Sequence, residues 1–489
     1  MDTNLLKLKP ELVWKHFSNI CALPHPSKHE EKVRDYIVNF AKENNIDTIV
    51  DEAGNVILYV PATAGFENRK TITMQGHLDM VPQKNSDKDF DFQTDSIEAY
   101  IDGEIVTANG TTLGADNGIG VAAALSVMEE CGSFEHGAIE ALFTIDEEAG
   151  MTGAFALQPG VLKGDILLNM DSEAEGELYV GCAGGCDVTA RIEFERTELE
   201  EGYKGYRLDV KGLKGGHSGI EIILQRGNSN KILSRLLHDA MNYFDVELSE
   251  INGGNMRNAI PREGYAIVAV VADQAEDFKA QLEKQADFIK NELSEVDPDL
   301  QITLTECEVP ETAIELHSAY STLMAVNVCP NGVDRMSDSI PGLVETSSNL
   351  GILTTKEDSF EAVMLVRSSI ESAKADLADR IVTTFEGICL SCECEVGGGY
   401  SGWKPNLESP ILKTMQETYE KMYGKTPQIM AIHAGLECGI LGATYPNLDM
   451  ISFGPTICYP HSPDESVNID SVAKMYDFLV ETIKNAPLK

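Results

Sequence analysis

The sequence has no long apolar run and few basic residues for its length. Its longest apolar run, Ala266–Ala272, is far shorter than the ~18 residues that cross a bilayer, and residues 1–10 have no apolar core of signal-peptide length. Lys and Arg number 38 against 79 Asp and Glu, and the resulting net charge of −41 repels phosphate backbones and anionic lipids. We therefore expect a cytoplasmic protein that binds neither nucleic acid nor membranes.

Two further classes are disfavoured by motifs that the sequence lacks. Its eleven cysteines are scattered and form no repeated CxxC pair, which argues against a zinc ribbon and predicts reduced thiols. The neighbours Cys182/Cys186 and Cys392/Cys394 are interpreted as small buried hydrophobic residues. Neither GxxxxGK[ST] nor a strand-linked GxGxxG occurs, so we do not expect nucleotide binding.

Apolar patterns along the chain predict an α/β protein. Short continuous apolar stretches, typical of strands buried on both faces, alternate with patterns of helical spacing. The predicted strands include 71–75, 138–145, 165–170 and 450–453, and the predicted helices include 29–44, 118–128 and 409–423. We predict a catalytic domain with a mostly parallel sheet flanked by helices, formed by 1–186 and 397–489. An α+β domain at 187–396 would interrupt it, with the glycines at 397–399 as a hinge.

Ionisable residues cluster just after the predicted strands. They are His77, Asp79, Glu147, Glu148, Asp171 and His461, together with Asp116 at the start of a predicted helix. In open α/β sheets ligands bind at the carboxyl ends of strands, so these side chains could converge. Each has a structural explanation on its own, but two histidines with several carboxylates are a ligand set suited to Zn²⁺ or Mn²⁺.

Spacing within the cluster suggests separate roles. His77 and Asp79 are two residues apart and would lie on the same side of a strand, so Asp79 could orient the imidazole. Of the adjacent Glu147 and Glu148, one could bind metal while the other accepts a proton from water. The charges of three ligand carboxylates, two divalent ions and one hydroxide add up to zero, which favours a pair of ions over a single one.

Five motifs, in order and spacing, resemble those of the co-catalytic zinc peptidases, a family that includes carnosinases, aminoacylases and succinyl-diaminopimelate desuccinylase. The motifs are Gly76–Asp79, Gly114–Gly118, Asp146–Glu148, Asn169–Asp171 and Pro460–Pro463. The likeness covers nearly the whole chain. Within the family, Gly215–Gly219, Gly253–Arg262 and Ala431–Gly439 are most similar to the members that cleave Xaa-His dipeptides such as β-alanyl-histidine.

The resemblance implies two metal ions that share Asp116, most simply Zn²⁺, although Mn²⁺ and Co²⁺ accept the same ligands. The other ligands would be His461 and Glu148 on one ion and His77 and Asp171 on the other. Glu147 would be the general base and later the proton donor to the leaving amine. The resemblance also makes the Asp116–Asn117 peptide a candidate for a cis bond.

By the same resemblance, residues 187–396 would form a lid whose His217 polarises the scissile carbonyl, in the same chain or across a dimer. A dipeptidase must also hold the substrate carboxylate, for which Arg367 and Arg262 are the candidates. Asn258 could add a lid contact. Glu437 could lie near the substrate ammonium or be a buried structural carboxylate, and the chain could be a monomer or a homodimer.

The main hypothesis is a two-zinc dipeptidase in which a hydroxide bridging the metals attacks the peptide carbonyl. A tripeptidase or an N-acyl-amino-acid deacylase with the same metal centre is the alternative. A metal- or peptide-binding module without catalysis is the remote alternative, because a pure binder has no need of a carboxylate held off the metal. The histidines without strand-end context, which we expect not to be ligands, are His25, His29, His136, His238 and His317.

Overall fold

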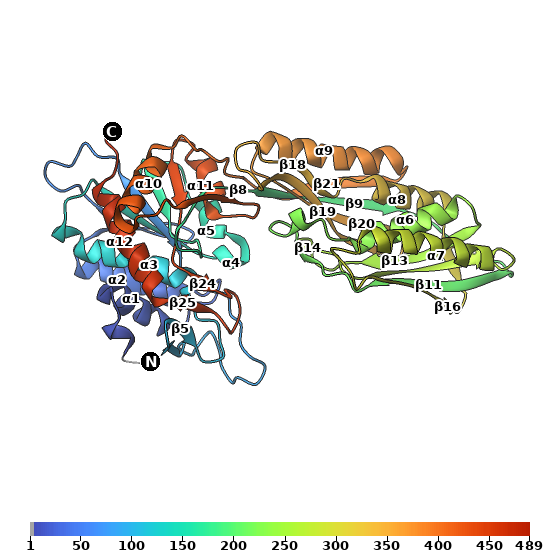
Figure 1. Cartoon of the computed structure of the whole chain (residues 1–489), viewed down its shortest axis with the longest axis horizontal. Coiled ribbons are helices and arrows are strands. Elements are labelled where there is room, and N and C mark those ends of the chain that lie inside the picture. The colour runs from blue at the N-terminus through green and yellow to red at the C-terminus, as the bar shows by residue number, and fades with distance from the viewer. Residues whose placement is uncertain (1–3) are drawn as a thin grey trace. The chain divides into compact units, whose positions relative to one another are not determined.

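Buried strands and helices alternate through the computed structural model, which describes residues 4–489 and divides into two units (Figure 1). Unit 1 consists of Met1–Cys182, Trp403–Ala431 and Leu436–Lys489. Unit 2 consists of Ala183–Gly402 and the short segment Ile432–Gly435. The chain therefore passes from one unit to the other four times. Within residues 4–489, no helix combines the length and hydropathy needed to cross a bilayer.

An eight-stranded sheet forms the centre of unit 1, in the order β1-β2-β6-β3-β7-β23-β8-β22. Its strands are β1 (Asp47–Val50), β2 (Val56–Val60), β3 (Ile72–His77), β6 (Ile139–Thr144), β7 (Ile166–Asn169), β8 (Glu177–Cys182), β22 (Gln428–Ile432) and β23 (Asp449–Ser452). The central strands β6, β3, β7 and β23 run parallel, whereas β1–β2, β2–β6 and β23–β8 are antiparallel pairs. Every residue of β3, β6 and β7 is buried, as expected for strands covered on both faces.

Helices and a small second sheet complete unit 1. The helices are η1 (Leu5–Lys7), α1 (Glu11–Cys21), α2 (Glu31–Glu43), α3 (Ala115–Glu130), η2 (Cys131–Ser133), α4 (Glu147–Gly150), α5 (Thr152–Ala156), α10 (Pro410–Tyr423), α11 (Glu437–Thr444) and α12 (Ile469–Lys484). The small sheet has the order β24-β25-β5-β4, with β4 (Ala99–Asp102), β5 (Ile105–Ala108), β24 (Ile457–Cys458) and β25 (Ser466–Asn468). Helix α3 packs on β3 and on α1, so the sheet centre is covered by apolar helix surface.

Unit 2 is built on an antiparallel sheet in the order β16-β11-β15-β13-β19-β20-β9-β21, with β18 paired to β19. These strands are β9 (Gly184–Glu193), β11 (Tyr203–Lys211), β13 (Val246–Gly253), β15 (Gly264–Val271), β16 (Gln301–Cys307), β18 (Gly332–Met336), β19 (Val344–Thr355), β20 (Ser359–Ser368) and β21 (Cys392–Tyr400). Two small pairs are β10 (Arg196–Glu198) with β17 (Thr312–Ile314) and β12 (Gly216–His217) with β14 (Ala259–Ile260). A short helix η3 (Ile222–Leu224) follows β12.

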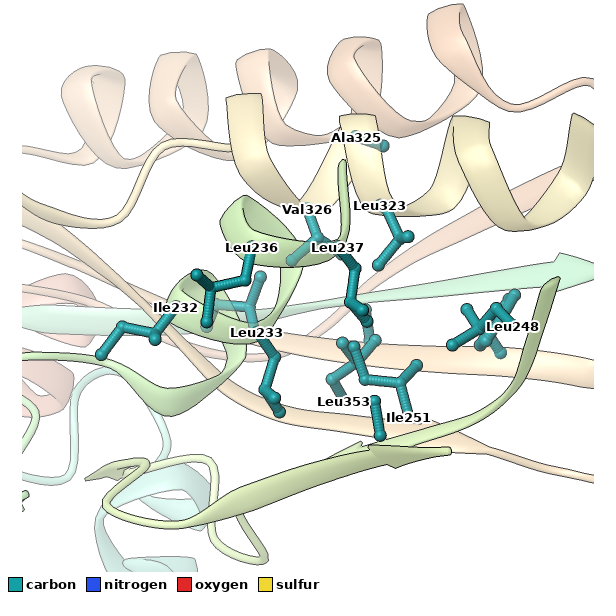
Figure 2. Close-up of a cluster of buried hydrophobic side chains, with 14 of the residues drawn as sticks. Ile232, Leu233, Leu236, Leu237, Leu248, Ile251, Leu323, Ala325, Val326 and Leu353 are labelled. Carbon is teal, nitrogen blue, oxygen red and sulfur yellow. The ribbon is translucent and has the colours of Figure 1, made fainter. Parts of the chain in front are cut away.

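Four helices lie along one side of this sheet, as Figure 1 shows. They are α6 (Ser229–Met241), α7 (Ala275–Glu292), α8 (Leu316–Val328) and α9 (Glu371–Ile388). Their apolar faces meet the sheet in one continuous core, part of which is drawn in Figure 2. There Leu233 and Leu237 of α6 and Val326 of α8 pack with Ile251 of β13 and Leu353 of β19. Burial of these side chains is what joins the helices to the sheet.

The fold class predicted from the sequence is confirmed, with parallel pairing at the centre of the unit 1 sheet. The expected hinge is wrong, because Gly397–Gly399 belong to strand β21, which pairs with β9 as far as Tyr400 opposite Gly185. A positive φ of 59° at Gly398, next to a register shift in the pairing, accounts for the glycine at that position. The sequence patterns also gave no sign of the small four-stranded sheet.

Candidate metal centre

Three neighbouring parallel strands end at one edge of the unit 1 sheet, and candidate ligands follow each of them. β3 ends at His77, Asp171 comes two residues after β7, and Glu147 and Glu148 begin α4 shortly after β6. β3 lies between β6 and β7 and is parallel to both, with His77 opposite Thr144. This register brings side chains from three separate parts of the sequence to the same edge, as predicted for the carboxyl ends of parallel strands.

Glu465 holds the loop that leads into Asp116. Its buried carboxylate, 2% exposed, accepts hydrogen bonds from four consecutive backbone N–H groups. Oε2 accepts from Leu113 at 2.7 Å and Gly114 at 3.0 Å, and Oε1 accepts from Ala115 at 2.8 Å and Asp116 at 3.2 Å. Because Glu465 follows His461 by four residues, one carboxylate fixes the Asp116 loop to the segment that carries His461. The peptide between Asp116 and Asn117 is cis, as the resemblance implied.

Asp116 presents one oxygen to each of two groups of candidate ligands. Its Oδ1 lies 3.1 Å from His77 Nε2, which is also 3.2 Å from Asp171 Oδ1. Its Oδ2 lies 3.2 Å from His461 Nε2, which is 3.1 Å from Glu148 Oε2. In each group the candidate ligand atoms lie within 4.8 Å of one another. One carboxylate is therefore shared by two sets of donors, each with one imidazole and one further carboxylate.

The three carboxylates of this cluster shift the pKa values of the groups around them. Burial raises the pKa of Asp171 to about 7; His77 opposes this rise, while the carboxylates of Asp116 and Glu148 add to it. Hydrogen bonds that His461 donates to Asp116 and Glu148 raise the pKa of its imidazole to about 11. Glu148 Oε1 is buried and has no hydrogen-bond donor. These shifts follow from the concentrated negative charge of the carboxylates, which metal ions would neutralise, and the donor set of two imidazoles and three carboxylates fits two divalent ions.

Glu147 lies beside this cluster without belonging to the two groups that share Asp116. Its carboxylate is within reach of His77 and Glu148, with the ligand atoms within 4.8 Å of one another. Burial raises its pKa well above the ordinary value; His77 opposes the rise, and the carboxylates of Asp171, Glu148 and Glu437 add to it. A carboxyl group with a raised pKa can both accept and return a proton near neutral pH.

Asp79 connects His77 to the start of helix α4. Its Oδ1 accepts from the Glu147 N–H at 2.9 Å, and its Oδ2 accepts from the Glu148 N–H at 3.2 Å and from Ser27 Oγ at 2.7 Å. His77 Nδ1 lies 2.9 Å from the backbone oxygen of Asp79 and 3.4 Å from its Oδ1. The imidazole is therefore oriented mainly by the Asp79 carbonyl, while the Asp79 carboxylate mainly holds the backbone of the glutamate pair.

Glu437, at the start of α11, is a fully buried carboxylate behind the strand ends. Its Oε2 accepts from Gln75 Nε2 at 2.6 Å and from Thr144 Oγ1 at 2.7 Å. Burial raises its pKa to about 7; hydrogen bonding by Thr144 opposes this shift, and nearby carboxylates contribute to it. Of the two interpretations left open by the sequence, these contacts support the structural one.

His217, in unit 2, has a defined tautomer. Its Nδ1 accepts hydrogen bonds from the backbone N–H groups of Gly219 and Ile220, both at 3.1 Å, so the ring proton is on Nε2. Burial, and then the charge of Arg367, lower its pKa, which favours the neutral ring. His217 can therefore donate a hydrogen bond through Nε2 while its backbone N–H is held by Glu221 Oε2 at 2.7 Å.

Arg367 and His433 lie close to His217 within unit 2. Arg367 is 5% exposed; its Nη1 donates to Tyr400 Oη at 2.8 Å, while its buried Nε has no acceptor. A Cβ on Gly219 would lie 2.1 Å from the His433 backbone oxygen and 3.2 Å from Arg367 Nε, so only glycine permits this close approach. Burial, with the charges of Arg367 and His217, lowers the pKa of His433 to about 3.

Asn258 and Arg262, the other two residues predicted to contact substrate, lie at the surface of unit 2. Asn258 is exposed, and its backbone oxygen accepts from the Ser218 N–H at 2.9 Å, next to His217. Arg262 is exposed and its Nη2 lies 3.4 Å from Glu263 Oε1, so it is already paired with a carboxylate. Arg367 is thus the better candidate for binding a substrate carboxylate.

Sequence reasoning missed Glu465 and His433. Glu465 carries no motif of its own, although it follows the Pro460–Pro463 motif closely, and His433 lies inside the Ala431–Gly439 motif. In residues 4–489, the only histidines in groups of potential metal ligands are His77 and His461. A fourth such group, which contains no histidine, comprises the buried carboxylates of Glu30, Asp79 and Asp146.

Comparisons with known proteins place these observations in a family. The model of peptidase family M20/M25/M40 matches residues 73–485. The cytosol non-specific dipeptidase of Escherichia coli K12 is 46% identical over 489 residues, which is 100% of each chain. The crystal structure of aminoacylhistidine dipeptidase from Vibrio alginolyticus has a TM-score of 0.93 at 46% identity, covering 99% of this chain and 98% of that one. A tripeptidase from Staphylococcus aureus has a TM-score of 0.56 at 14% identity, covering 98% of both chains, and shares the fold.

Proposed function

Because this chain belongs to peptidase family M20/M25/M40, we propose that it is a cytoplasmic, metal-dependent dipeptidase whose substrates include Xaa-His dipeptides such as β-alanyl-histidine. The observation that carries this proposal is Asp116, whose two oxygens each face one histidine and one group of candidate ligands. The dipeptidase from Escherichia coli and the aminoacylhistidine dipeptidase from Vibrio alginolyticus support the substrate class.

Five residues would hold the two metal ions. His77 and Asp171 would bind one ion and Glu148 and His461 the other, with Asp116 shared between them. When bound, the ions would polarise the scissile carbonyl and lower the pKa of water. Their identity as zinc rests on the mixture of imidazole and carboxylate donors, which Mn²⁺ and Co²⁺ also accept.

Glu147 is the proposed general base. It accepts a proton from the water whose oxygen attacks the peptide carbonyl carbon, and it returns this proton to the nitrogen as the C–N bond breaks. Its backbone is fixed by Asp79 Oδ1, so the carboxylate keeps its place beside Glu148 while remaining outside the groups that share Asp116. The raised pKa of Glu147 suits both halves of this transfer.

Unit 2 supplies the proposed substrate contacts. We assign residues 187–396 to a lid in which His217 donates through Nε2 to the carbonyl oxygen as negative charge develops there. Arg367 has an unused buried Nε and is assigned to the substrate carboxylate, with Asn258 as an additional contact. The shielded side chain of Arg367 would bind this carboxylate more strongly than an exposed arginine could.

A metal-dependent substrate panel tests the proposal. Purified protein is stripped with a chelator, its metal content is measured, and Zn²⁺, Mn²⁺ or Co²⁺ is added back before assay. We expect hydrolysis of Xaa-His and other dipeptides to disappear and return with the metal. Preference for tripeptides or N-acetyl amino acids would instead identify a tripeptidase or a deacylase, and metal binding without hydrolysis of any panel member would identify a binding module.

A further inference from the structure

Two cysteines of unit 2 lie side by side at the start of the edge strand β21. Cys392 and Cys394 are two residues apart, so their side chains leave the strand on the same face, and their Sγ atoms are 3.9 Å apart. They are opposite Ile192 and Ala190 of β9, which are buried in the core beneath the helices. Both cysteines are partly exposed and reduced. Their side chains pack against the hydrophobic core of unit 2, so the interpretation of this pair as small hydrophobic residues is confirmed in part, although neither side chain is fully buried.

The spacing of the two sulfurs matches chelation better than disulfide formation. Residues two apart on a strand have Cα atoms about 6.6–6.8 Å apart, at the upper limit for a disulfide. Two sulfurs bound to one tetrahedral ion with metal–sulfur bonds of about 2.3 Å are about 3.8 Å apart. The observed separation of 3.9 Å therefore needs almost no change to place both sulfurs on the same ion.

The contact between the two sulfurs favours a thiolate at one of them. The hydrogen bond from Cys392 lowers the pKa of Cys394 despite partial burial, while the same contact raises the pKa of Cys392. Glu386, exposed near the end of α9, accepts the Cys394 N–H through Oε1 at 3.3 Å. This contact is with the backbone of the strand, so the two sulfurs would be the protein ligands of the ion and water would complete a four-coordinate site.

We propose that Cys392 and Cys394 form a chelating dithiolate site for a thiophilic divalent ion of the Zn²⁺ or Cd²⁺ class, separate from the candidate metal centre of unit 1. Thiolates are the soft donors that such ions prefer. Binding releases the protons of both thiols to solvent, and the ion gains two thiolate ligands without any change of oxidation state. The site neither depends on the proposed peptidase function nor uses any of its residues.

Cd²⁺ is the probe, added to the full-length, metal-loaded and reduced protein, because its bonds to thiolate give an ultraviolet charge-transfer band. The five proposed ligands of unit 1 are imidazoles and carboxylates, so binding there gives no such band. We expect one equivalent of Cd²⁺ to produce the band in the wild type. The variants Cys392→Ala and Cys394→Ala each lose one arm of the chelate and should bind at least ~100-fold more weakly.

The matched control is Cys458→Ala, which removes an exposed cysteine of unit 1 and should leave the band and the affinity for Cd²⁺ unchanged. Peptide hydrolysis by these three variants and by the Cys392→Ala, Cys394→Ala double variant is measured in parallel to show that all four are folded. An undiminished band in the Cys392→Ala, Cys394→Ala double variant would overturn the proposal. The proposal would also be overturned if the wild-type protein gave no band with Cd²⁺ and mild peroxide instead joined Cys392 and Cys394 in a disulfide, as detected by peptide mapping.

Discussion

Replacing Glu465 by glutamine should loosen the loop that presents Asp116 and weaken metal binding. Glutamine keeps one acceptor oxygen, so two of the four backbone N–H groups at residues 113–116 would lose their acceptor and face an amide NH₂ instead. Burial raises the pKa of Glu465 to about 7, so the loss is worked out for the ionised carboxylate above that pH. Hydrogen bonds to a charged group contribute about 1.5–3 kcal/mol each, so the expected loss is about 3–6 kcal/mol. Even the lower end corresponds to on the order of a 100-fold change in an equilibrium constant.

The assay compares wild type, Glu465→Gln and Glu417→Gln, the last an exposed glutamate on α10 that serves as a control for the loss of one negative charge. Bound metal is measured by elemental analysis at increasing chelator concentration, and the thermal unfolding midpoint is recorded for each metal-loaded protein. We expect Glu465→Gln to release metal at far lower chelator concentration and to unfold at lower temperature. Equal metal retention and equal midpoints in all three proteins would refute the reasoning.

Three further predictions concern single side chains. Glu147→Gln should retain metal and lose roughly 10²–10⁴-fold in kcat, because proton transfer is removed while the metal ligands remain. Asp116→Asn should lose metal as well as activity. Wild-type turnover by Glu147→Gln would exclude Glu147 as the base. Arg367→Lys should raise the KM for dipeptides by at least ~10-fold because the planar fork that grips a carboxylate is lost, and an unchanged KM would exclude that contact. The folded-state pKa of about 3 at His433 lies below its ordinary value, so the unfolded chain binds a proton that the folded chain does not, and stability should fall as pH falls from about 6.5 towards 3. His433→Gln should flatten the pH dependence of the thermal midpoint in this range, and identical slopes in both proteins would contradict the assignment.

The candidate ligands could be predicted because each follows a strand whose apolar run is visible in the sequence. His77 ends β3 and Asp171 follows β7. Both strands are fully buried, so their continuous apolar sequences identify them as central strands of the sheet. Parallel pairing then fixes which ends meet, and this rule needs no knowledge of side-chain contacts. The assignment of roles within the cluster remains a proposal, because it rests on chemistry that the backbone pattern does not carry.

Residues whose importance lies in long-range contacts could not be found in the same way. Glu465 acts on the backbone of residues 113–116, about 350 positions earlier in the chain, and nothing in its own neighbourhood signals four N–H donors. His433 is set beside Arg367 and Gly219 only by the return of Ile432–Gly435 to unit 2. The Cys392/Cys394 pair was visible as a spacing, but the distance between its sulfurs depends on the strand conformation.

The place of β23 in the unit 1 sheet has a consequence for synthesis of the chain. β23 lies between β7 and β8, although both neighbours belong to the first 182 residues and β23 begins at Asp449. Translation at roughly 5–20 residues per second therefore needs about 13–53 s to produce the intervening chain. During that time the apolar edge of β7 emerges from the ribosome without its neighbour. The pairing of β7 with β23 therefore cannot form until almost the whole protein has been made, and until then β7 presents an unpaired strand edge of the kind that promotes aggregation.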